Sequence, residues 1–267
     1  MMREASDRAG TPARDGNRRE FLMTSAMTIL LGALAKAPAW AGGRPAAMDA
    51  WARQVVGLKE DLLSGRIGVS DWQTRIEVLN RSVPLAELTA YLDVDRLTRD
   101  FKYPSLLADI ANPALPPEIV GEAGMKKWFV RIFGMRQGGA IIPHVHNNMV
   151  SAHLVVSGSF RARTHDRVKD LSDAVVLRQT RDAELKAGEI ISMSDKRDNQ
   201  HWLVAREDRS MTFDVGIVDL PASWNYGLEA NEYNMIFVDP TNPPQSDGTI
   251  VAPILTFEQA KSKFAPA

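Results

Sequence analysis

The stretch that most constrains the fold is residues 138–158, GGAIIPHVHNNMVSAHLVVSG, in which two apolar runs flank the pair Asn147 and Asn148. Each run is too short for an ordinary helix, and both are bounded by glycine or asparagine. Asparagine pairs suit tight turns. Short apolar runs bounded by turn residues indicate β-strands. We therefore predict strands at 140–145 and 150–156 that are joined by a turn.

The same pattern of short apolar runs and turn residues extends over most of the C-terminal half. The other predicted strands lie at 128–135, 160–164, 174–177, 184–185, 190–193, 202–205, 211–218 and 233–238. Many short strands at this spacing are typical of a β-sandwich or a closed barrel. We predict a mainly β domain over residues 123–267.

Residues 42–122 have a different pattern, which predicts a helical N-terminal extension followed by a proline-rich linker. Apolar residues recur at steps of three and four from Met48 onward. Gly65 and Gly68 interrupt the pattern, and a second amphipathic run follows Ser70, which suits a helix N-cap. We expect these helices to be a packing or lid element.

The first 41 residues resemble a twin-arginine export signal. Arg18 and Arg19 precede an apolar segment at 23–35 that is too short to cross a bilayer core of about 30 Å. Ala-Trp-Ala at 39–41 supplies the small residues of a cleavage site. The resemblance implies the twin-arginine translocase as a partner, a periplasmic or secreted location and no stable membrane span. The alternative is a buried N-terminal helix.

The composition limits the partners and the metal ligands that this chain can have. The 32 basic and 33 acidic residues nearly cancel, which gives no reason to expect nucleic acid as a partner. The chain has no cysteine, so disulfides, thiolate ligands and a cysteine nucleophile are excluded for this sequence. Any metal bound here has nitrogen and oxygen ligands.

Three of the five histidines lie within residues 138–158. His144 and His146 are two residues apart in a predicted strand, so both imidazoles leave the same face. Two neutral imidazoles on one face are a common part of a metal site. The alternative is a pair of histidines that stabilises a strand edge through hydrogen bonds.

The spacing in this stretch resembles the first motif of the cupin superfamily. Gly138, His144, His146, Ser151 and Gly158 fall at the intervals of that motif, with Ser151 where most cupins have a glutamate ligand. The resemblance implies a double-stranded β-helix barrel. Cupins often pair through their sheets, so a homodimer is one expectation.

A degraded second cupin motif covers residues 185–191 and leads to His201. The usual spacing places a histidine at Asn199, so His201 requires a longer loop. The resemblance implies a metal held by His144, His146 and His201. An alternative for His201 is a loop histidine that hydrogen bonds to a nearby aspartate.

Without the glutamate, the predicted site is similar to that of the three-histidine cupins, of which the thiol dioxygenases are the best-known oxidoreductase branch. The order of turn, HxH, Met149, apolar strand and glycine hairpin is also the same as in that branch. The resemblance implies iron(II) and a small anionic or thiol substrate. The alternatives are a manganese, zinc or nickel cupin that acts as a lyase or isomerase, and a periplasmic ligand- or metal-binding protein without turnover.

Four further residues are candidates for other roles. His153 shares the strand face of Ser151 and is open to four interpretations: a fourth ligand, a hydrogen-bond partner of the site, a general base, or a core histidine. His165 is expected at the exposed end of a hairpin. Arg161 and Arg163 share one face of their strand, where they either hold a substrate carboxylate at the barrel mouth or face solvent.

Overall fold

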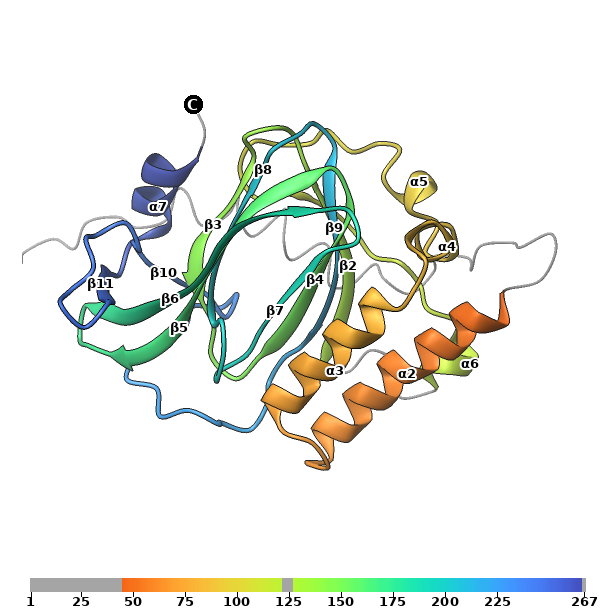
Figure 1. The fold of residues 1–267 in the computed structure, drawn as a ribbon, viewed down its shortest axis with the longest axis horizontal. Helices are drawn as coiled ribbons and strands as arrows, with labels where there is room; N and C mark the ends of the chain where they lie inside the picture. Colours follow the sequence, from red (N-terminus) through yellow and green to blue (C-terminus); the bar gives the residue numbers. More distant parts are fainter. Residues whose placement is uncertain (1–44, 122–126, 266–267) are drawn as a thin grey trace, which may run out of the picture. The chain divides into compact units, whose positions relative to one another are not determined.

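The computed structural model describes residues 45–121 and 127–265, which form two curled β-sheets with helices packed outside them (Figure 1). The predicted export signal, with Arg18 and Arg19, lies outside the described residues. Among the residues described, none of the helices is both long enough and apolar enough to span a membrane.

In the part of the chain that the structure describes, the strands pair antiparallel and form one sheet of five strands and one of six. The first sheet has the order β1 (Asp109–Ala111), β2 (Trp128–Met135), β9 (Ser210–Ile217), β4 (Val150–Ser157) and β7 (Ile190–Met193). The second has the order β10 (Ile236–Phe237), β3 (Ala140–Val145), β8 (Gln200–Ala205), β5 (Ser159–Asp170), β6 (Ala174–Lys186) and β11 (Thr249–Pro253). The chain changes sheet at every step from β2 to β5 and again at every step from β6 to β10. This topology confirms the predicted double-stranded β-helix.

Strands β9 and β4 of the five-stranded sheet are buried on both faces. Along β4, Ala152 and Leu154 belong to the hydrophobic core beneath the helices, whereas Val155 belongs to an apolar cluster that also contains Leu203 of the opposite sheet. Ser151 and His153 alternate with Ala152 and Leu154, so they share the inward face of Val155. The barrel therefore presents polar side chains from β4 to its interior.

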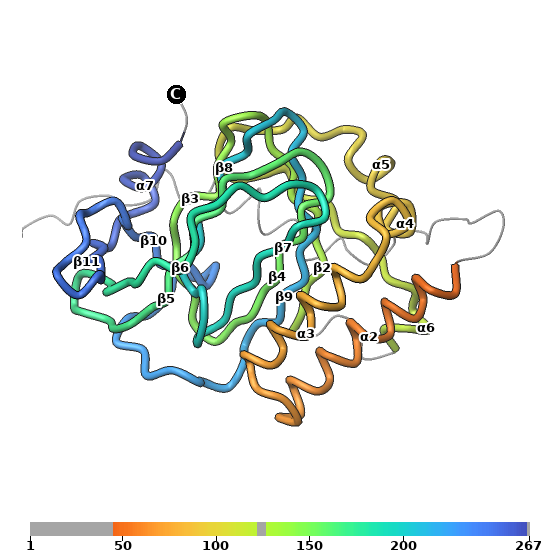
Figure 2. The backbone as a smooth tube through the Cα atoms, in the orientation of Figure 1, coloured from red at the N-terminus to blue at the C-terminus, as the bar shows by residue number. Residues whose placement is uncertain are grey.

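The N-terminal helices cover the outer face of the five-stranded sheet (Figure 2). They are α2 (Ala46–Leu63), α3 (Val69–Arg81), α4 (Leu85–Tyr91) and α5 (Val94–Leu97), and a short α6 (Pro117–Val120) follows. The Trp51 ring of α2 packs against Phe213 of β9, with ring centroids 5.9 Å apart. Ser70 is not the N-cap of its helix, because α3 begins at Val69 after Gly68, and no side chain caps it.

The C-terminal region adds two elements that the sequence pattern did not predict, β11 and α7 (Phe257–Phe264). A capping box between Thr256 and Gln259 starts α7. Phe264 packs edge-on against Trp202 of β8, so this helix lies on the outer face of the six-stranded sheet. The strand predicted at 233–238 is confined to β10. Residues 218–235, which join β9 to β10 without regular structure, are called the strap.

Candidate metal centre

Sheet pairing brings two of the predicted ligands together. His144 of β3 lies directly opposite His201 of β8, and their ring centroids are 4.2 Å apart. His146 follows the end of β3, with its ring centroid 4.6 Å from that of His144. One ring nitrogen from each of the three residues lies within 4.8 Å of the other two. This spacing suits three ligands of one metal ion.

The second ring nitrogen of each histidine is held by a backbone carbonyl. His144 Nδ1 lies 2.8 Å from the oxygen of Ile142, and His201 Nδ1 lies 3.4 Å from the oxygen of Asn199. His146 Nδ1 is bonded to the carbonyl oxygen of Asn234. A carbonyl oxygen only accepts, so each Nδ1 carries the proton and donates it. Nε2 is therefore the nitrogen left on each ring to bind a metal.

Burial keeps these imidazoles neutral. His144, His146 and His201 are 2–4% exposed. Burial lowers the pKa of His144 to about 4, although its bond to the Ile142 carbonyl acts in the opposite direction. Burial, together with the neighbouring histidines, lowers the pKa values of His146 and His201 well below the ordinary value. A neutral imidazole is the form that binds metals.

The three histidines fit a divalent transition metal by the chemistry of their donors. All three donors are imidazole nitrogens, and each ring is oriented by a carbonyl in the way that metal-bound histidines usually are. Three protein ligands would leave further coordination positions for other molecules. Imidazole suits iron, zinc, copper and nickel alike, so the donor set does not choose among them.

His153 uses both ring nitrogens inside the protein. Its Nδ1 lies 2.5 Å from Asp214 Oδ2, and its Nε2 lies 2.8 Å from Ser151 Oγ. The carboxylate accepts from Nδ1, so Nε2 accepts the hydroxyl proton of Ser151. The His153 ring centroid is 5.2 Å from that of His201. The structure thus places His153 beside the three histidines as a hydrogen-bonded neighbour.

The two predicted substrate-binding arginines are not brought to the histidines. They alternate along β5 with the fully buried Phe160 and Ala162, so they leave the outer face of the strand. Arg161 donates to both carboxylate oxygens of Asp182, at 2.7 and 2.9 Å. The guanidinium of Arg163 lies 4.1 Å from the centre of the Trp202 ring.

His165 is buried, so its expected position at an exposed hairpin end is wrong. Its side chain is bonded to Gln200, and burial lowers its pKa. The pairing of β5 with β6 shifts register between Thr164 and His165, and both residues are buried. A bulge of this kind changes which residues face inward.

Sequence reasoning missed two residues that contact the site, Asp214 and Asn234. Asp214 lies in the apolar run MTFDVGIV, and an acid within an apolar strand is a signal that could have been used. Asn234 is distant in the chain from the residues it contacts, and the sequence pattern carries no comparable signal for it.

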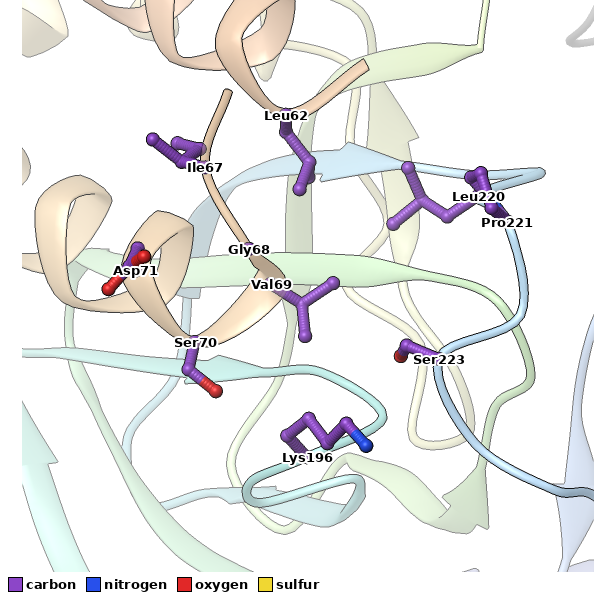
Figure 3. A pocket seen from close by; sticks show the side chains of 10 residues that line it. All are labelled: Leu62, Ile67, Gly68, Val69, Ser70, Asp71, Lys196, Leu220, Pro221 and Ser223. Atoms are coloured by element: carbon purple, nitrogen blue, oxygen red, sulfur yellow. The ribbon is translucent and has the colours of Figure 1, made fainter. Parts of the chain in front are cut away.

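A pocket of about 340 Å³ has none of the three histidines in its lining (Figure 3). Leu62 and Val69 line one side of it, and Leu220 and Pro221 of the strap line another. Lys196 lines it as well. The pocket borders both the first part of the strap and the turn between α2 and α3.

No protein-family model matches the chain, and no curated protein matches it in sequence. Among solved structures, KdgF from Halomonas sp. is similar over 40% of this chain and 76% of its own, with 17% identity and a TM-score of 0.29. A cupin superfamily protein from Desulfitobacterium hafniense is similar over 42% and 78%, with 9% identity and a TM-score of 0.28. An oxalate oxidase is similar over 41% and 49%, with 12% identity and a TM-score of 0.28. These likenesses are too weak to identify a substrate, so the residues of the site carry the proposal that follows.

Proposed function

We propose that the chain is a non-haem metal dioxygenase in which His144, His146 and His201 hold iron(II) and a small anionic or thiol substrate is oxidised. The proposal rests on the donor set, which consists of three neutral, buried imidazoles. Such ligands leave the charge of a divalent metal uncompensated, and low dielectric strengthens its attraction for an anion. A thiolate or enolate donor would therefore be favoured over a neutral one.

Iron(II) at this position would supply Lewis acidity and the redox chemistry needed to use dioxygen. With a thiol as substrate, both oxygen atoms enter the product, RSH + O₂ → RSO₂H. The sulfur supplies all the electrons that dioxygen accepts, so no further reductant is required.

His153 is the proposed proton-handling residue. Asp214 holds the proton on Nδ1 and leaves Nε2 as the acceptor of the Ser151 hydroxyl. A proton released when the substrate ionises passes to the Ser151 oxygen, while Ser151 gives its own proton to His153. The carboxylate of Asp214 then stabilises the imidazolium, as an aspartate does in hydrolytic triads.

A metal-binding protein without turnover is the second candidate, and the near-complete burial of the three histidines favours it. A manganese, zinc or nickel lyase or isomerase with His153 as fourth ligand would require His153 Nε2 to give up its hydrogen bond to Ser151.

We also propose that the protein is exported after its metal is bound, on the basis of Arg18 and Arg19. Cell fractionation of Arg18→Lys/Arg19→Lys should find the protein retained in the cytoplasm, and unchanged export would contradict that part.

Dioxygen uptake tests the catalytic proposal. Protein loaded with iron(II) under anaerobic conditions is mixed with small thiols and small carboxylates in an oxygen electrode. We expect the amount of dioxygen consumed to match the amount of oxidised product. We also expect His144→Ala to abolish this uptake. A compound that raises the melting temperature without any dioxygen uptake would instead identify a binding protein.

A further inference from the structure

The three metal-site histidines differ in where their Nδ1 partners come from. His144 and His201 each bond to a carbonyl two residues earlier in their own segment. His146 bonds to Asn234, which is 88 residues away along the chain and lies near the end of the strap. The orientation of this one ligand therefore depends on the position of a separate segment.

The Asn234 side chain makes two hydrogen bonds to the backbone of Asn147, the residue that follows His146. Its Oδ1 accepts from the backbone N–H of Asn147 at 3.1 Å, and its Nδ2 donates to the backbone oxygen of Asn147 at 2.6 Å. Asn234 has a φ of 58°, a left-handed conformation that asparagine tolerates better than most residues. This backbone geometry lets the Asn234 side chain face Asn147 while its carbonyl faces His146.

The rest of the strap is attached to the same short turn. Asn147 Nδ2 donates to the backbone oxygen of Leu228 at 2.9 Å, and the N–H of Asn148 donates to the hydroxyl of Tyr226 at 2.8 Å. The N–H of Leu220 donates to the backbone oxygen of Asn148 at 3.0 Å. The beginning, middle and end of the strap thus all bond to residues 147–148, immediately after a metal-site histidine.

A buried arginine ties the turn and the strap together from β5. Arg167 donates to the backbone oxygen of His146 at 3.1 Å and to Asn147 Oδ1 at 2.7 Å. Asp170 binds the guanidinium at 2.7 and 2.6 Å and accepts from the N–H of Gly227 at 2.9 Å. A buried charge pair with several hydrogen bonds has a strict geometry, so it defines one closed position of the strap.

The strap is held mainly by these polar contacts. Irregular segments of this length are uncommon in compact domains and are usually functional loops. Leu220 anchors the beginning of the strap in the hydrophobic core beneath the helices, but residues 221–235 are all exposed or half-buried. A segment with few buried apolar contacts opens at a lower free-energy cost than the barrel unfolds.

We propose that the strap is a latch for the metal centre and that Asn234 is a positioning residue for His146. This inference rests on the proposed metal site. With the strap closed, the Asn234 carbonyl holds His146 in the tautomer whose Nε2 binds metal. When the strap opens, His146 loses this partner and binds metal more weakly. By linkage, bound metal stabilises the closed strap to the same extent.

The test combines metal affinity with hydrogen exchange, using zinc(II) as the probe. Asn234→Gly keeps the backbone carbonyl and tolerates the left-handed φ, but removes both bonds to Asn147. Asn242→Gly is the matched control, because the Asn242 side chain donates only to the backbone oxygen of Val251, outside the strap. Tyr226→Phe, which removes the hydroxyl bonded to Asn148, is a milder second variant.

We expect zinc to slow hydrogen exchange across residues 218–235 in the wild type, and Asn234→Gly to lower zinc affinity about tenfold or more. Tyr226→Phe should lower it less, and Asn242→Gly should leave it unchanged. If Asn234→Gly bound zinc with wild-type affinity, or if zinc did not change the rate of hydrogen exchange in the strap, the latch alone would be overturned. Zinc binding that His144→Ala does not reduce would overturn the metal centre and the latch with it.

Discussion

His144 and His201 lie directly opposite each other on β3 and β8, with ring centroids 4.2 Å apart. The register of two paired strands therefore sets the spacing of two candidate ligands. Ligands carried on strands are held more precisely than ligands carried on loops. His146 lies at the end of β3 and is held by the strap, so it is the adjustable member of the set.

Replacement of His153 separates proton handling from metal binding. His153→Asn removes the acceptor of the Ser151 proton but leaves the three metal-site histidines in place. We expect unchanged metal content and a fall in dioxygen uptake of about 10²-fold to 10⁴-fold. Metal analysis and an oxygen electrode on the same sample measure both quantities. Loss of the metal in this variant would make His153 a ligand.

The pH dependence of stability follows from the buried histidines. Unfolded His144 binds a proton below pH 6.5, whereas burial lowers its pKa in the folded chain to about 4. The unfolded state binds more protons between these values, so the metal-free protein loses stability as pH falls from 6.5 towards 4. His144 alone accounts for about 3 kcal/mol at about 1.36 kcal/mol per pKa unit.

Urea denaturation at about pH 7.5 and about pH 5 measures the part of this loss that occurs above pH 5. His144→Gln, which cannot titrate, should show a smaller decrease between the two pH values than the wild type. An equal decrease in both proteins would mean that His144 is not the source. His146 and His201, whose pKa values are also lowered, should retain their own part of the effect in this variant.

The helical N-terminal segment is predicted to be part of the folded core. Trp51 is buried against Tyr91 and Phe213, and its Nε1 donates to Asn80 at 3.2 Å. Trp51→Ala should lower the free energy of unfolding by about 3–5 kcal/mol. Val78→Ala, at a side chain that is 62% exposed, should change it by less than about 0.5 kcal/mol. Similar small effects in both variants would show that the helices are dispensable.

Local patterns predicted the barrel well where strands are short apolar runs between turn residues. The bounds predicted at 128–135, 140–145 and 190–193 are those of β2, β3 and β7. In each case the ends are set by local chemistry, either a glycine turn or a change to polar residues. The HxH spacing likewise follows from strand periodicity, which is a local property.

Features that depend on distant partners were not predictable in this way. Asn234 contacts His146 and Asn147, which are 88 and 87 residues earlier in the chain. Hydrophobic periodicity carries no information about contacts at that separation. The sequence pattern predicts an exposed turn at His165 because the apolar pattern ends there, whereas β5 and β6 continue beyond it through a bulge. The strand predicted at 233–238 includes the end of the strap because Tyr233 and Met235 extend the apolar run of β10.

Elemental analysis of the chain folded in the cytoplasm tests the central claim most directly, with wild type measured beside three histidine variants. The account predicts about one divalent metal ion per chain in the wild type and in His165→Ala. It also predicts loss of most of that metal in both His144→Ala and His201→Ala. Equal metal content in all four proteins, or none in the wild type, would contradict a metal centre built on these histidines.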